Sequence, residues 1–251
     1  AGAVVFGAAW AYIPAYLQAK RGSHVVITTI MFNFIASSLM VFLLVDVIRD
    51  FKQMGPHTVA LPKELWFPTF KELAHLFGVK IRYSPLNLSF LIAIAASFFV
   101  WFLIWKTKWG YEMRAVGHNT KAAIYAGISP HKNIIIAMLI SGGLAGMLGI
   151  NEILGVHHKI VAGFPAGYGF TGIAVALMGR NHPVGIFPAA FLFGILYQGG
   201  SEVTFDMPNI TRYMFVAVQG VIILFSGALE NLFRPQIESF FVNRINKEEM
   251  A

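Results

Sequence analysis

The sequence contains no cysteine among its 251 residues, which excludes disulfides, thiolate metal sites and cysteine nucleophiles. Charge is also scarce, because only 12% of the residues are charged while 57% are hydrophobic, and the mean hydropathy is +0.65. A soluble globular domain does not tolerate such a composition. We therefore expect an integral membrane protein of the all-α class, a polytopic bundle of transmembrane helices.

Motifs for several kinds of catalysis are also missing. The chain has no Gly-x-x-x-x-Gly-Lys-Ser/Thr run to hold nucleotide phosphates, and no Gly-x-Ser-x-Gly or His-Glu-x-x-His motif. His157 and His158 are adjacent, but no cluster of carboxylates accompanies them. The net charge of +7 comes without a basic stripe interleaved with aromatic residues. We therefore predict no catalytic residue, metal, cofactor or nucleic-acid partner, and any ATP hydrolysis belongs to another subunit.

Seven apolar segments are present in the sequence. They are Ala3–Leu17, His24–Ile48, Leu88–Trp105, Asn133–Val156, Phe170–Met178, Val184–Leu196 and Tyr213–Leu229. A bilayer core of roughly 30 Å needs about 20 helical residues. The segment Phe170–Met178 is too short to cross alone and is flanked by glycine and proline, so we expect a broken or re-entrant helix that is buried or lines a cavity.

The basic residues suggest which side of the membrane each connection occupies. With the turn at Lys20 and Arg21 in the cytoplasm, eleven of the 19 basic residues are cytoplasmic. Residues 49–87 then form an external loop, in which a capping-box pattern at Thr69 predicts an interfacial helix. Residues 106–132 and the charged tail after Leu229 are cytoplasmic. We interpret residues 1–251 as one transmembrane permease domain. Because the chain begins inside an apolar run, we expect earlier spans to precede it.

The polar segment 106–132 encodes one very short helix. Asn119 is a good N-cap, the residues from Thr120 to Ala126 tolerate a helix, and Gly127 is a typical C-terminal stop. Ser129 and Pro130 then cap and open the next helix. Two turns are too few to be stable in water, so this helix must lie against its own protein or a partner at the membrane face. Such a helix suits a coupling element.

Small residues recur four positions apart in the spans, which is typical of close helix packing. Gly142 and Gly146 form one such pair, and Ala145 and Gly149 form another. Ala190 repeats the pattern with Gly194. These pairs predict a densely packed bundle.

Polar residues inside the spans are candidates for a substrate path. Asn33 and Ser37 lie one helical step apart, and Thr29 extends the same face. Glu152 is ionisable within a span, although a place near the interface or a pairing with a neighbouring helix would explain it equally well. The remaining candidates are Phe170, which could stack on a planar ligand, and Gln219, which could bond to a polar one.

Three stretches resemble a known family. The run Met113–Ile128 resembles the cytoplasmic coupling segment of bacterial ABC importer permeases, in the superfamily of branched-chain amino-acid, ribose and nucleoside permeases. The runs Gly167–Gly185 and Thr28–Ile35 are similar to the versions found in the nucleoside and simple-sugar permeases. The resemblance extends from about Ala8 to Ala228.

This resemblance implies a multi-pass subunit of the bacterial inner membrane, in contact with lipid, that moves nucleosides or simple sugars. It also implies an ATP-binding subunit, a second permease subunit in a heterodimer, and an extracytoplasmic substrate-binding protein. The residues expected to couple to the ATP-binding subunit are Arg114, Gly117, Asn119, Ala122, Ala123, Ala126 and Gly127. Two alternatives stay open: a branched-chain amino-acid ABC permease, and an ion-coupled secondary carrier that would use intramembrane carboxylates.

Overall fold

A computed structural model describes residues 1–48, 55–70, 86–164, 167–207, 214–222 and 224–225 of the chain. The chain divides into two compact units, Ala1–Ala166 and Gly167–Ala251, and each is considered by itself. The described residues contain helices and two isolated β-bridges but no strand. This secondary-structure content confirms the prediction of an all-α protein.

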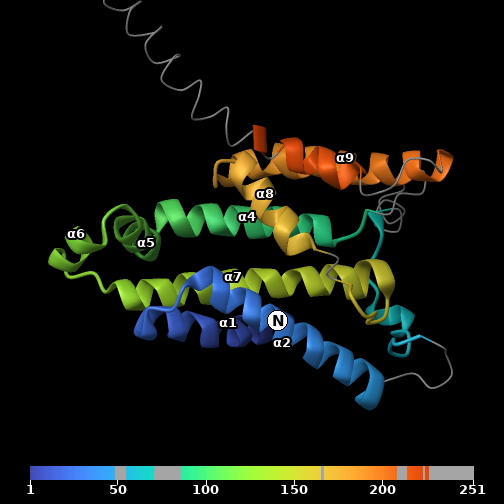
Figure 1. The fold of residues 1–251 in the computed structure, drawn as a ribbon, viewed down its shortest axis with the longest axis horizontal. Helices are drawn as coiled ribbons and strands as arrows, with labels where there is room; N and C mark the ends of the chain where they lie inside the picture. Colours follow the sequence, from blue (N-terminus) through green and yellow to red (C-terminus); the bar gives the residue numbers. More distant parts are fainter. Residues whose placement is uncertain (49–54, 71–85, 165–166, 208–213, 223, 226–251) are drawn as a thin grey trace, which may run out of the picture. The chain divides into compact units, whose positions relative to one another are not determined.

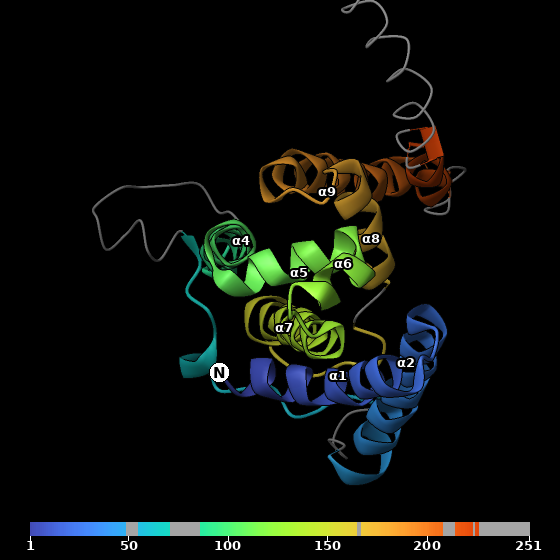
Figure 2. The ribbon, with the colours of Figure 1, turned by 90° about the vertical axis from the view of Figure 1, so that its left-hand side faces the viewer.

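The first unit contains most of the helices. They are α1 (Gly2–Arg21), α2 (Val25–Phe42) with a π-helical extension (Leu43–Val47), a 3-10 turn (Lys63–Leu65), α4 (Ser89–Lys106), α5 (Lys108–His118), α6 (Thr120–Tyr125) and α7 (Pro130–Ile150) with a π-helical extension (Asn151–His157). Figure 1 shows α5 and α6 together at one end of this unit. Seen from that end in Figure 2, α7 lies between α1 on one side and α4 and α5 on the other.

The second unit contains α8 (Tyr168–Met178) and α9 (Pro183–Asp206), followed by a helical segment at residues 214–222. As expected, α8 is short and begins after a glycine, Gly167, whose φ is +79°. The predicted apolar segment Val184–Leu196 lies within α9, and this helix continues beyond it to Asp206. Two glycines at positions 199 and 200 do not stop the helix, and Gln198 donates a hydrogen bond of 3.0 Å to Glu202 one turn later.

Four helical stretches are long and apolar enough to cross a membrane. They are Val25–Val47, Ser89–Lys106, Pro130–His157 and Pro183–Asp206. These stretches agree with four of the predicted spans, and α8 is the predicted short apolar helix. This result confirms the prediction of a polytopic transmembrane bundle, because each of these helices is long and apolar enough to cross the bilayer core.

Glycine allows α1 and α7 to approach until their backbones touch. A Cβ added to Gly146 would lie 2.2 Å from the carbonyl oxygen of Ala3, and one added to Gly7 would lie 2.4 Å from the carbonyl oxygen of Gly142. The packing role predicted for Gly142 and Gly146 is therefore confirmed. The other two small-residue pairs behave differently, because a Cβ on Gly149 or Gly194 would meet nothing within 4 Å among the described residues. For those two glycines dense packing remains a prediction.

The polypeptide from residue 55 to 70 lies against the end of α7 that is remote from α5 and α6. Backbone hydrogen bonds join Thr58 to Ile160 at 3.1 Å and Leu61 to His158 at 2.8 Å. The indole of Trp66 stacks on the imidazole of His158 with ring centroids 3.7 Å apart. Thr69 pairs with Asn87 in an isolated antiparallel bridge, while most of the helix predicted to begin at Thr69 lies outside the described residues.

Candidate coupling segment and membrane cavities

The short helix predicted in the polar segment is present as α6. The side-chain oxygen of Asn119 accepts a hydrogen bond of 3.1 Å from the backbone N–H of Ala122, which satisfies one of the free donors of the first turn. Gly127 follows the helix with φ +78°, a conformation that glycine adopts without strain. Both capping predictions are confirmed, so the local sequence determines where α6 begins and ends.

Burial divides α6 into an inner and an outer face. Ala123 is only 3% exposed, so it packs inside the chain. Tyr125, in contrast, is 93% exposed, and the neighbouring Ile124 is 57% exposed. The two large apolar side chains of α6 therefore lie on its outer face, and a role of this face in docking a partner remains a prediction.

The sequence interpretation missed Ile124 and Tyr125, although a signal was present. They are two large side chains in a helix otherwise made of small and polar residues. Of the residues expected to couple to an ATP-binding subunit, Arg114, Gly117, Asn119, Ala122, Ala126 and Gly127 are exposed. Their role in coupling remains a prediction, and Ala123 can act only by supporting the helix.

A second helix in this segment, α5, was not predicted. Its N-cap is Thr107, whose side-chain oxygen accepts a hydrogen bond of 3.2 Å from the N–H of Gly110. Gly110 itself must be glycine, because a Cβ there would lie 2.2 Å from the carbonyl oxygen of Leu103 in α4. The corner between α4 and α5 is therefore tight.

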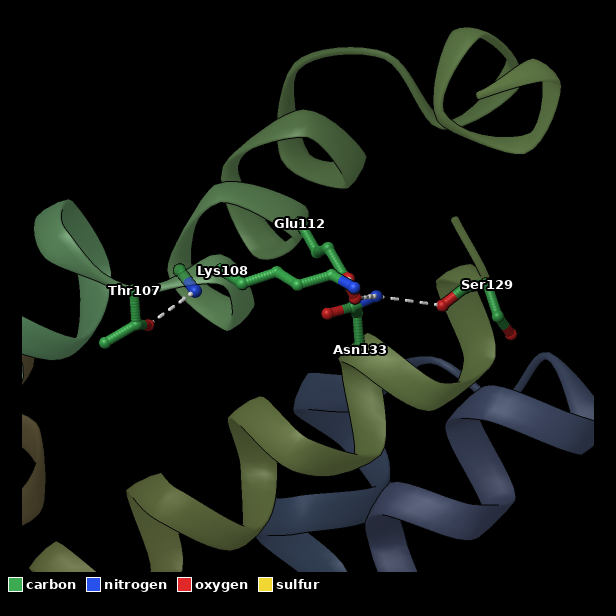
Figure 3. A network of polar contacts seen from close by, with 6 residues as sticks. Thr107, Lys108, Glu112, Ser129 and Asn133 are labelled. Carbon is green, nitrogen blue, oxygen red and sulfur yellow. Dashed lines mark hydrogen bonds and ion pairs between the residues drawn. The ribbon is translucent and has the colours of Figure 1, made fainter. Parts of the chain in front are cut away.

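Asn133 joins α5 to the start of α7 (Figure 3). This side chain is buried, and its Nδ2 donates to the Glu112 carboxylate at 3.4 Å and to the Ser129 carbonyl oxygen at 3.1 Å. Lys108 pairs with the same carboxylate at 4.0 Å. Ser129 occupies the N-cap position as predicted, but its side chain makes no capping hydrogen bond, so the local signal at Ser129 was only partly right.

We expect the buried Asn133 to be needed for the stability of this corner. Asn133→Leu keeps the approximate volume but removes both donated bonds, leaving Glu112 and a carbonyl with fewer donors, at a cost of about 1–3 kcal/mol. Asn133→Asp should cost more, because it places a second carboxylate beside Glu112. Thermal unfolding of the purified protein measures both. The matched control is Thr120→Val on the exposed surface, and unchanged unfolding of Asn133→Asp would contradict the structural role of this contact.

A cavity of about 310 Å³ lies between α1, α2 and α7, and Asn33 lines it. Thr29 and Ser141 add two hydroxyl groups to its wall, while Trp10 and Phe32 add aromatic rings in an edge-to-face arrangement with centroids 6.0 Å apart. Asn33 is exposed, and its amide has no hydrogen-bond partner among the described residues. The structure thus places the predicted Thr29 and Asn33 in the wall of one cavity. It adds three residues that the sequence analysis missed because they come from three separate segments: Trp10, Phe32 and Ser141.

The other predicted path residues lie elsewhere. Ser37 is exposed and does not line this cavity. Phe170, on α8, is 66% exposed, and Gln219 is half-buried in the helical segment 214–222, both in the second unit. The structure therefore does not place these three with Asn33 in the cavity of the first unit, and their role in a path remains a prediction.

Glu152 is buried at the far end of α7. One of its oxygens accepts a hydrogen bond of 3.2 Å from Asn151, and the other lies 3.6 Å from Nε2 of His157. The neighbouring His158 stacks on Trp66, whereas His157 lies beside Glu152, so the two adjacent histidines point in different directions. Glu152 is thus paired, but within its own segment and not across to another helix.

Comparison with known proteins identifies the family. The model of the family "Branched-chain amino acid transport system / permease component" matches residues 1–227. The chain belongs to this family. It is consequently a multi-pass protein of the inner membrane and a permease component, in agreement with the resemblance found in the sequence and with the four apolar helices.

Individual relatives in this family are named for nucleosides and sugars. The chain is 37% identical to a guanosine ABC transporter permease protein of Bacillus subtilis, over 89% of this chain and 62% of the relative. It is 34% identical to a glucose ABC transporter permease protein of Haloferax volcanii, over 97% and 64%. It is also 34% identical to a nucleoside ABC transporter permease protein of Lactococcus lactis, over 86% and 59%. The chain therefore spans about three-fifths of these relatives, and no solved structure matches it.

Proposed function

We propose that this permease component is the membrane subunit of an ATP-driven importer of nucleosides or simple sugars. The permease family and the three relatives named for guanosine, glucose and nucleosides support this assignment. The observation that carries it is the form of α6, a two-turn helix capped at both ends that presents Ile124 and Tyr125 outward. A subunit that hydrolyses no ATP needs such a rigid contact to receive motion from one that does.

The chemistry of this segment defines the partner surface. Five basic residues lie in 106–132, namely Lys106, Lys108, Arg114, Lys121 and Lys132, against the single carboxylate of Glu112. An aromatic side chain surrounded by positive charge fits an apolar pocket with an acidic rim. The ATP-binding subunit would supply that pocket. The helix α5 and the contact between Glu112 and Asn133 would then pass its motion to α7.

The cavity at Asn33 suits a nucleoside better than an aliphatic amino acid. It offers the amide of Asn33 and the hydroxyls of Thr29 and Ser141 to the polar sugar, and the rings of Trp10 and Phe32 to the flat base. A leucine side chain would leave these polar groups without partners, which costs binding free energy. The branched-chain amino-acid alternative is therefore less favoured, although the family carries that name.

An ion-coupled carrier is also less favoured, because the carboxylate of Glu152 already has partners within the chain. Coupling ions in such carriers are bound by intramembrane carboxylates or unwound backbone. Glu152 is already bonded to Asn151 and paired with His157. Asp46, a second carboxylate in the apolar segments, lies near the end of its span. A second permease subunit and an extracytoplasmic substrate-binding protein complete the proposed importer.

Transport by the whole complex tests this proposal. The complex would be reconstituted in vesicles with its binding protein, and guanosine, ribose, glucose and leucine would be offered separately with and without ATP. We expect ATP-dependent accumulation of the nucleoside or of a sugar. Asn33→Leu should lower that uptake about fivefold, because one hydrogen bond to the ligand contributes about 1 kcal/mol.

Ser38→Leu provides the matched control, since Ser38 lies on the same helix, is exposed and does not line the cavity. Its uptake should equal that of the parent chain. Accumulation of leucine alone would overturn the substrate class. Accumulation driven by an ion gradient without ATP would overturn the proposed mechanism.

A further inference from the structure

A second pocket, of about 210 Å³, adjoins the Asn33 cavity, since Trp10 and Ala36 line both. The rest of its wall is apolar and includes Leu39 and Leu43, from α2 and its π-helical extension, and Ile160, which follows α7. It lies toward the end of α2 that the predicted topology places outside the membrane. We therefore call it the outer pocket.

One face of α2 lines both spaces. Thr29, Phe32, Asn33 and Ala36 line the Asn33 cavity, and the outer pocket continues this face with positions 36, 39, 40, 43, 44 and 48. Steps of three and four residues keep these side chains on a single side of the helix. From position 29 to 48 the face is about 28 Å long, close to the roughly 30 Å of a bilayer core. The two spaces therefore lie in series along one membrane span.

Trp10 and Ala36 form the boundary between the two spaces. Ala36 is at the midpoint of the candidate span Val25–Val47 and contributes only a methyl group, so most of the boundary is the indole of Trp10. Phe32 packs edge-to-face against that indole, with ring centroids 6.0 Å apart. This contact restricts the orientation of the indole.

We propose that the outer pocket is the entry to the Asn33 cavity and that the indole of Trp10 is the barrier between them. At rest an apolar passage closed by a ring excludes water and ions, because narrow apolar constrictions dewet. The polar groups of Thr29, Asn33 and Ser141 lie behind the barrier, and the indole turns aside to let substrate reach them. The inference rests on the proposed transport function and adds to it a route and the residue that closes the route.

Thiol labelling tests the barrier, and a chain without cysteine provides a clean background. Ser141→Cys places one thiol in the Asn33 cavity with little change in size, whereas Leu43→Cys places one in the outer pocket. The complex in right-side-out vesicles would be treated with a membrane-impermeant methanethiosulfonate, without substrate or ATP, and labelling of this chain would be followed in time. We expect Ser141→Cys to label about tenfold more slowly than Leu43→Cys, which corresponds to about 1.4 kcal/mol in the barrier to access.

Changes at Trp10 then assign the barrier. Trp10→Ala should raise the labelling rate of Ser141→Cys about tenfold, because it joins the two spaces, whereas Trp10→Phe keeps a ring and should leave labelling slow. Leu43→Cys lies outside the barrier and should label equally in all three backgrounds, which separates an opened barrier from a loosened fold. If Trp10→Ala fails to fold, Trp10→Leu replaces it as a smaller change. Equal labelling of Ser141→Cys with and without the indole would refute the barrier, and failure of both cysteines to label from outside would refute the route.

The result is separable from the transport assay, because labelling needs neither substrate nor ATP. Accumulation of leucine alone would overturn the proposed substrate class and leave a labelling difference between Trp10 and Trp10→Ala in place. Conversely, ATP-dependent uptake of a nucleoside together with unchanged labelling in Trp10→Ala would leave the proposed function standing and remove the barrier.

Discussion

Replacing Tyr125 with aspartate is expected to reduce substrate-stimulated ATP hydrolysis and uptake by about thirtyfold, because an aromatic anchor at an interface contributes 2 kcal/mol or more. Tyr125 is 93% exposed at the tip of the segment, so the change leaves the fold of this chain intact and acts on the docked state. The aspartate also carries a negative charge toward a surface that we propose to be acidic. Stimulated ATPase activity of the reconstituted complex and co-purification of the ATP-binding subunit would both be measured.

Tyr111→Asp is the matched control. Tyr111 is a tyrosine of the adjoining helix α5 and is 62% exposed, so the same change is made at an exposed position outside α6. Stimulated ATPase activity should remain near that of the parent. Full coupling in Tyr125→Asp would remove α6 as the docking element. Ala123→Glu would be a weaker test of docking than Tyr125→Asp, because Ala123 is buried and a charge there would unfold the segment itself.

Gly146→Leu is expected to prevent the first unit from forming its helix pair. Even the Cβ of leucine would lie 2.2 Å from the carbonyl oxygen of Ala3 and 3.5 Å from the Cα of Val4, and backbone cannot yield as a flexible side chain does. Separating α1 from α7 loses their close packing, at a cost of about 3 kcal/mol or more. The yield of folded protein from membranes and its unfolding temperature would report this loss.

The same helix supplies the control for that experiment. Gly149→Leu introduces an identical side chain one turn further along α7, where a Cβ would meet nothing within 4 Å among the described residues. Its yield and unfolding temperature should stay close to those of the parent chain. Equal losses in the two variants would mean that glycine is needed in α7 for a reason other than contact with α1.

The sequence alone determined the features that depend on neighbouring residues. Apolar length located the spans, since a helix must satisfy its own backbone in lipid. The ends of α6 followed from Asn119 and Gly127, because a cap bonds within three residues and a positive φ is a property of one residue. The apolar segment Val184–Leu196 located α9 but not its end, because the helix continues to Asp206 through residues that are no longer apolar.

The tertiary structure alone decided which of several similar residues carry a role. Gly146 touches α1 whereas Gly149 does not, although both belong to the same kind of small-residue pair. Ala123 is buried whereas the neighbouring alanine, Ala122, is exposed. The Asn33 cavity and the outer pocket join segments far apart in the chain. Periodicity fixes the face of a helix on which a residue lies, but the partner of that face is set by packing among distant segments, which no local pattern encodes.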